Sequence, residues 1–210
     1  MQSLLTRVKE IPPEINKLIE QRLSEFSSFK NKPAEDWFSE LCFCILTANS
    51  RAVTGMKIQK ELGSKGFLEK TQDEIRDAII RNKHRFHNNK SRYIIEARKF
   101  SDIKSKINEI TKREGILEAR EWIVDNIKGI GFKEASHFLR NTGHEELAIL
   151  DRHILNIMND YKIIERPRIL NKKSYLRIEI KFQEIAKKLN ISSSRLDLLM
   201  WYLKTGEVLK

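Results

Sequence analysis

A lysine and an aspartate, Lys133 and Asp151, are the residues of this chain whose types and spacing best suit covalent chemistry. Lys133 comes two residues after the turn Gly129–Gly131, and Asp151 stands where the hydrophobic periodicity predicts the start of a later helix. A neutral amine can attack the anomeric carbon of a sugar, and a carboxylate can stabilise the positive charge that develops there. The pair therefore indicates chemistry at a sugar carbon, such as the removal of a damaged base from DNA.

Each of the two residues also has an ordinary structural explanation. Lys133 falls in the first turn of a predicted helix from Phe132 to about Asn141, where the helix dipole disfavours an ammonium charge and so favours the neutral amine. Most lysines are nevertheless simply solvated. Asp151 suits the N-cap of the following helix, because its carboxylate can accept a free amide hydrogen of the first turn. Capping and catalysis are compatible, so the argument depends on the two residues together.

The segment before Lys133 is suited to holding a phosphate. Glycines at 129 and 131 allow a sharp bend or a close approach by a partner, and the amides of Gly129, Ile130 and Gly131 precede a helix N-terminus. Lys128 adds a positive charge. An ordinary turn between two helices is the alternative, but a basic chain favours a grip on the DNA backbone.

The composition agrees with a nucleic-acid partner and excludes several other classes. The net charge is +11 and the isoelectric point is about 9.6, which favours a polyanion such as nucleic acid or an anionic membrane surface. No apolar run is long enough to cross a bilayer, and Arg7, Lys9 and Glu10 interrupt any signal-peptide core, so we expect a soluble, intracellular protein. The two cysteines, Cys42 and Cys44, are too few for a disulfide framework or a cysteine-bound cluster and are expected to be reduced core residues.

Helical periodicity dominates the whole chain, and roughly ten to twelve helices with short connections are expected. Pro12-Pro13 opens a helix that continues to Phe26, and the nearly all-apolar run Trp37–Ala48 predicts a central buried helix. Capping boxes are predicted at Thr71–Glu74 and at Ser194–Asp197.

These motifs together resemble a known family. The run Lys128–Lys133 (KGIGFK) followed by Asp151 resembles the helix-hairpin-helix and aspartate signature of base-excision DNA glycosylases, with Lys128 in place of the usual proline. The flanking runs Phe132–Asn141 and Ala148–Leu155, and a short C-terminus without cluster-binding cysteines, are similar to the archaeal-type 8-oxoguanine DNA glycosylase/lyases. Endonuclease III and adenine glycosylases usually carry such cysteines. The similarity extends from about Trp37 to the C-terminal lysine.

The resemblance implies a fold and a mechanism. We expect an all-α protein of two helical subdomains with a cleft between them, one formed by residues 1–35 with 145–210 and the other by residues 36–144, which ends in the helix-hairpin-helix. Lys133 would attack the anomeric carbon, expel 8-oxoguanine and form a Schiff base, after which β-elimination would nick the strand. Asp151 would assist departure of the base. The target base must first leave the stack.

Further site residues follow from the resemblance. Asn49, in the run Thr47–Ser50, is expected to fill the gap left by the extruded base. Phe86 and Trp201 are expected to sandwich that base, and the terminal Lys210 to contact it. Arg152 and His153 are expected to touch phosphates. The basic segment Arg81–Arg92 is expected to form a DNA-facing loop that delivers Phe86, with a solvated helix junction as the alternative. The alternatives are a core Trp201, a Phe86 that anchors a helix, and a frayed Lys210.

The expected partner is double-stranded DNA that contains 8-oxoguanine or abasic sites, with no membrane partner and no oligomer. No cofactor or metal is expected for the reaction, although relatives often hold a monovalent cation on the hairpin carbonyls when DNA is bound. The protein is expected in the cytoplasm of a prokaryotic cell, at the nucleoid. Two alternatives remain: the same chemistry on another lesion such as an oxidised pyrimidine, and a non-catalytic helix-hairpin-helix module, which would need neither Lys133 nor Asp151.

Overall fold

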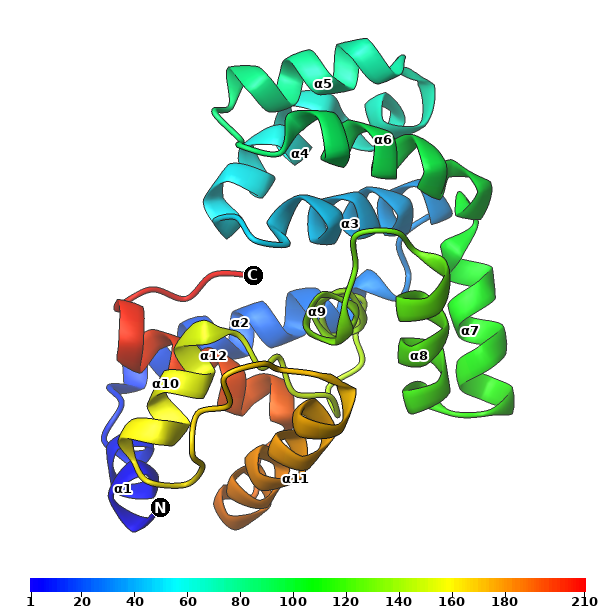
Figure 1. Cartoon of the computed structure of the whole chain (residues 1–210). Helices are drawn as coiled ribbons and strands as arrows, with labels where there is room; N and C mark the ends of the chain where they lie inside the picture. Colours follow the sequence, from blue (N-terminus) through cyan, green and yellow to red (C-terminus); the bar gives the residue numbers. More distant parts are fainter. The chain divides into compact units, whose positions relative to one another are not determined.

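The protein is all-helical, as the sequence predicts. A computed structural model describes residues 1–210 and contains twelve α-helices and one short 3₁₀ helix (Figure 1). The number of helices lies within the expected range. None of them is both long and apolar enough to cross a membrane.

The chain divides into two compact units. Met1–Phe29 belongs with Leu139–Lys210, here called unit 1, and Lys30–Phe138 forms unit 2. The boundaries expected from the family resemblance were after residues 35 and 144 instead. The second boundary falls earlier because it lies within helix α9 (Phe132–Asn141), whose last residues belong to unit 1: Arg140 lies over the ring of Phe26 at 4.6 Å.

Unit 1 is organised around its last helix, α12 (Ser193–Thr205), which contacts each of the unit's other helices outside α9. These are α1 (Gln2–Lys9), α2 (Pro13–Phe29), α10 (Arg152–Asp160) and α11 (Lys172–Leu189). The capping box expected at Ser194–Asp197 is wrong. Ser192 caps α12 by accepting the amide of Arg195, and Asp197 is buried, with its carboxylate 2.6 Å from the guanidinium of Arg140. Leaving a buried carboxylate unpaired costs more free energy than a second helix cap contributes, so Asp197 pairs with Arg140.

Unit 2 is built around α3 (Ala34–Thr47), which contacts α4, α6 and α7. Its other helices are α4 (Ala52–Glu69), α5 (Gln72–Arg81), α6 (His87–Ala97), the 3₁₀ helix η1 (Arg98–Phe100), α7 (Ile103–Arg113) and α8 (Ile116–Asn126). Every residue of α3 from Trp37 onwards is buried, so the predicted central helix is confirmed. Cys42 and Cys44 are unbonded to each other and buried within it, and burial raises the pKa of the Cys42 thiol.

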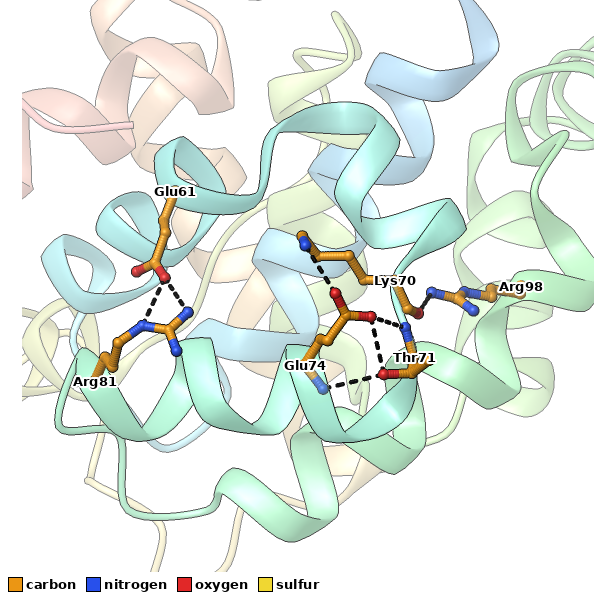
Figure 2. A network of polar contacts seen from close by, with 6 residues as sticks. All are labelled: Glu61, Lys70, Thr71, Glu74, Arg81 and Arg98. Carbon is orange, nitrogen blue, oxygen red and sulfur yellow. Dashed lines mark hydrogen bonds and ion pairs between the residues drawn. The ribbon is translucent and has the colours of Figure 1, made fainter.

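Polar contacts fix the helices that lead to the α5–α6 connection (Figure 2). The predicted capping box at Thr71–Glu74 is confirmed, and the Thr71 amide, followed by the Lys70 ammonium, lowers the pKa of the Glu74 carboxyl to about 2. At the other end of α5, Arg81 pairs with Glu61 of α4. Arg98 of η1 donates to the carbonyls of Phe67 and Lys70 at the C-terminus of α4. Arg81 thus joins the end of α5 to α4, and Arg98 joins η1 to the end of α4.

Candidate active site

Helices α8 and α9 form the predicted hairpin. Helix α8 ends at Asn126, α9 begins at Phe132, and the amide of Ile130 donates to the carbonyl of Ile127 at 3.3 Å across the turn. The side chain of Ile130 is buried, while Lys128, Gly129 and Gly131 are exposed. The turn is therefore held in unit 2 by two buried apolar side chains, Ile127 and Ile130, and exposes the backbone between them.

The two glycines of the turn serve different purposes. Gly129 has φ of +82°, and a Cβ atom there would lie 2.4 Å from the ring of Tyr93 on α6. The close approach that Gly129 permits is thus to the protein's own aromatic ring. At Gly131 the nearest atom to an added Cβ is an oxygen of Glu134 at 3.7 Å, so this position has room for a partner. Tyr93 was not anticipated from the sequence, since one tyrosine on a helix carries no distinguishing signal.

Replacing Gly129 with alanine is expected to destabilise the hairpin. The left-handed backbone alone costs an L-residue about 1–2 kcal/mol, and displacement of the Tyr93 ring adds to this. Gly206→Ala is the matched control, because Gly206 also has a left-handed backbone, with φ of +75° and ψ of 7°, and nothing lies within 4 Å of an added Cβ. Thermal unfolding of both variants should show the larger loss for Gly129→Ala. Equal losses would mean that the contact with Tyr93 is unimportant.

Lys128 lies on the exposed side of the turn. Its ammonium is 3.2 Å from a carboxylate oxygen of Glu96 on α6, and the Lys128 side chain is 64% exposed. Exposed ion pairs contribute at most about 1 kcal/mol, so Glu96 holds Lys128 only weakly. Lys128 thus remains able to contact a phosphate.

Lys133 occupies the first turn of α9, as expected. Its Nζ lies 3.3 Å from Oε1 of the neighbouring Glu134, and the two side chains are 25% and 14% exposed. An ion pair within the first turn of α9 therefore fixes the position of the Lys133 amine. Glu134 was not identified from the sequence, where an acidic residue in a first turn is commonplace.

Asp151 belongs to unit 1 and caps α10, as predicted. Its Oδ1 accepts the amide of Ile154 at 2.8 Å, and the side chain is only partly buried. The preceding segment is held by α11: Tyr175 donates to the carbonyl of Ala148 at 2.7 Å, and Glu179 accepts the amide of Ala148 at 3.0 Å. Both of these α11 side chains are buried. Tyr175 and Glu179 were not predicted from the sequence, although polar residues four positions apart on an apolar helix face were a usable signal.

His153 and Trp201 lie together in unit 1, whereas separate roles were expected for them, a phosphate contact for His153 and stacking on the base for Trp201. Their ring centroids are 4.9 Å apart in an edge-to-face arrangement. Neither the buried Nδ1 of His153 nor the buried Nε1 of Trp201 has a hydrogen-bond partner within the protein. Buried polar atoms without partners are uncommon and mark a place where a ligand can complete the bonding. Arg152 is exposed at the start of α10, and Lys210 is partly exposed at the chain end.

Asn49 and Phe86 are brought close to one another in unit 2. Asn49 has φ of +60°, and its carbonyl accepts a hydrogen bond from Arg85 at 3.2 Å. The guanidinium of Arg85 also lies over the ring of Phe86 at 5.1 Å, and Phe86 is 39% exposed. The sequence did not reveal that Arg85 links the two residues.

The basic segment Arg81–Arg92 is not a continuous DNA-facing loop, which corrects the expectation. Its second half belongs to α6, and two of its basic side chains, His84 and Lys90, are buried. His84 Nε2 lies 2.8 Å from the carbonyl of Leu46, and Lys90 Nζ donates to the carbonyl of Ile45 at 2.6 Å. These carbonyls belong to the last turn of α3, where no backbone amide of the helix is available to donate to them. Because buried carbonyls require hydrogen-bond partners, the side chains of His84 and Lys90 supply them.

The fold and the hairpin define a helix-hairpin-helix protein with a lysine behind the turn, and comparison with known proteins gives the family. The model of the family described as 8-oxoguanine DNA glycosylase (Ogg-HhH) matches residues 19–191, and the chain belongs to this family. It is 48% identical to the 8-oxoguanine DNA glycosylase/AP lyase of Methanocaldococcus jannaschii over 99% of both chains, and 40% identical to that of Aquifex aeolicus over 98% and 99%.

Solved structures agree with this assignment. The M. jannaschii 8-oxoguanine glycosylase/lyase, crystallised with a 15mer DNA containing 8-oxoguanine, matches with a TM-score of 0.94 and 46% identity, over 99% of this chain and all of that one. The Thermotoga maritima 8-oxoguanine DNA glycosylase matches with a TM-score of 0.91 and 40% identity, over 100% and 99%. Similarity over the full length of both chains supports the archaeal-type branch suggested by the sequence.

Proposed function

We propose that this protein is a bifunctional repair enzyme that excises 8-oxoguanine from duplex DNA and then cleaves the strand at the abasic site. The observation that carries the proposal is the position of Lys133, in the first turn of α9 directly behind an exposed glycine turn. Its setting supplies both a grip for the DNA backbone and an amine beside it. Near-identical chain lengths and 48% identity to a glycosylase/AP lyase support the same activity here.

The amine of Lys133 drives both steps. Once the damaged nucleotide leaves the stack, the neutral amine forms a bond to C1′ while the glycosidic bond breaks, and the base departs with the bonding electron pair and acquires a proton. Ring opening gives an imine between Lys133 and C1′. Loss of a proton from C2′ then expels the 3′ phosphate, which nicks the strand, and hydrolysis of the imine restores the lysine.

The remaining site residues bind the DNA backbone and stabilise the sugar as the base leaves. The amides at Gly129–Gly131, together with Lys128, hold a phosphate at the N-terminus of α9, and Arg152 contacts another at the N-terminus of α10. Asp151 stabilises the positive charge on the sugar as the base leaves. Asn49, whose backbone Arg85 holds, fills the space left in the stack.

The extruded base is recognised by Phe86, Trp201 and Lys210. His153 contacts the nucleotide beside Trp201. Replacing Phe86 or Trp201 with alanine, or deleting Lys210, should slow excision of 8-oxoguanine by roughly tenfold more than it slows cleavage at a preformed abasic site. An abasic duplex contains no base to recognise, so it isolates the recognition step. Single-turnover rates on the two duplexes measure the ratio. An equal loss on both would make these residues structural.

The proposed function is tested by borohydride trapping on duplexes with one 8-oxoguanine, with one abasic site and with no damage. A covalent protein–DNA adduct is expected with the first two and not with the third. An adduct with the abasic duplex alone would retain the Schiff-base chemistry and assign the enzyme to another lesion, such as an oxidised pyrimidine. No adduct on any duplex would leave a DNA-binding module.

The reaction itself requires no cofactor in this proposal. Gly129, Ile130 and Gly131 offer neutral backbone carbonyls and no charged side chain, and such ligands suit a monovalent cation when DNA is bound. Replacing potassium with tetramethylammonium at constant ionic strength should then weaken DNA binding.

The protein acts as a monomer on the chromosome in the cytoplasm. Sedimentation with DNA would test the monomeric state, and a fluorescent fusion that follows the nucleoid would test the location.

A further inference from the structure

Helix α6 lies against the exposed turn of the hairpin. The ring of Tyr93 is so close to Gly129 that a Cβ atom added there would lie 2.4 Å from it. From the same helix, a carboxylate oxygen of Glu96 lies 3.2 Å from Nζ of Lys128, the residue before Gly129. Two consecutive residues of the turn are therefore in contact with α6, so this part of α6 borders the proposed phosphate site.

Glu96 has a second basic neighbour, which is on its own helix. Nε of Arg92 lies 3.8 Å from Oε1 of Glu96, whereas Nζ of Lys128 lies beside Oε2, so each cation faces a different oxygen of one carboxylate. The Arg92 guanidinium also lies over the ring of Tyr93 at 5.4 Å and donates to Oδ1 of Asn89 at 3.5 Å. Arg92 and Lys128 are both exposed, so a ligand can reach them.

The Glu96 carboxylate opposes DNA binding at the turn, because it repels a phosphate that approaches Lys128. Exposed ion pairs contribute little to the stability of a fold, so stability is a weak reason to keep a carboxylate at this position. Chemistry supplies a stronger reason. A carboxylate and a DNA phosphate each present two oxygens that share a negative charge, and each can accept hydrogen bonds from two cations.

We propose that Glu96 holds Arg92 and Lys128 in the free protein as a substitute for a DNA phosphate, and that DNA displaces it. Arg92 then becomes a backbone contact on α6 beside the hairpin. Because two ion pairs must break before the phosphate binds, Glu96 lowers the affinity for undamaged DNA, which is held by backbone contacts alone. This inference rests on the proposed function, in which the turn and Lys128 hold a phosphate.

The test is the affinity of Glu96→Gln for an undamaged duplex, measured by fluorescence anisotropy over a range of salt concentrations. Glutamine keeps the length and polarity of the side chain but leaves both cations unpaired before DNA binds. Binding should tighten by roughly threefold to tenfold, and the slope of log Kd against log salt should become steeper.

Glu109→Gln is the matched control for the change in net charge. Glu109 of α7 also lies between two cations, Lys106 at 3.2 Å and Arg113 at 3.4 Å, and it belongs to the same unit. This variant should tighten binding less than Glu96→Gln does. In the opposite direction, Arg92→Gln should weaken binding and reduce the salt slope by about one, whereas Arg113→Gln should change both less.

Three results would overturn the inference: equal affinities for the two glutamate variants, weaker binding by Glu96→Gln, or a gain in affinity that persists after Arg92 and Lys128 are both replaced by glutamine. None of them would affect the proposed function, which is decided by covalent trapping on damaged duplexes. Absence of binding by the unaltered protein to any duplex would instead overturn the proposed function.

Discussion

Lys133→Gln is expected to abolish strand cleavage and covalent trapping, with rates lowered by roughly a thousandfold or more. Glutamine keeps the length and polarity of the side chain but has no amine to form a bond with C1′. The first turn of α9 should be undisturbed, because Lys133 is partly exposed and its one ion pair is with the adjacent Glu134. Borohydride trapping and nicking of 8-oxoguanine and abasic duplexes measure the loss.

The same variant should bind duplex DNA within a few-fold of the unaltered protein, which shows that chemistry and not folding is lost. Lys128→Gln is a useful comparison, because it removes the same charge from the exposed turn five residues earlier. It should weaken DNA binding and reduce its salt dependence, while the bound complex still forms the adduct. Cleavage retained by Lys133→Gln would eliminate this lysine as the nucleophile and direct the search to another amine.

Asp151→Asn should slow excision of 8-oxoguanine by about a hundredfold or more while leaving the fold stable. Asparagine caps a helix about as well as aspartate, so the bond from the Ile154 amide at 2.8 Å can be retained. What is lost is the negative charge that stabilises the sugar as the base departs. Single-turnover excision and thermal unfolding, measured on the same preparation, separate these two roles.

Asp151→Ala completes the comparison, because it removes the cap as well as the charge. It should lose about 1 kcal/mol of stability in addition to the excision defect. An Asp151→Asn variant with nearly full activity, beside an unstable Asp151→Ala variant, would show that Asp151 is a helix cap and nothing more. A defect confined to excision, with abasic cleavage less affected, would support its action on base departure.

Local patterns in the sequence were sufficient to predict the helices, the position of Lys133 in the first turn of α9 and the position of Asp151 at the N-cap of α10. Apolar periodicity predicted an all-α fold and the buried helix that became α3, and the capping box at Thr71–Glu74 is present. Each of these features depends on residues within a few positions of one another. The hairpin, the place of Lys133 in the first turn of α9 and the cap at Asp151 are local in the same sense. The family resemblance also follows from such short runs.

Tertiary structure decided the features that depend on distant parts of the chain. The basic segment before Arg92 resembled a surface loop. His84 and Lys90 are nevertheless buried, because they bond to the backbone carbonyls at the end of α3. Asp197 pairs with Arg140 instead of capping its own helix. Gly129 is required partly by the ring of Tyr93, and the approach to Asp151 is held by α11. In each case a buried polar group or a close contact had to be satisfied by residues far away in sequence, and a local pattern carries no information about which residue folding will bring to it.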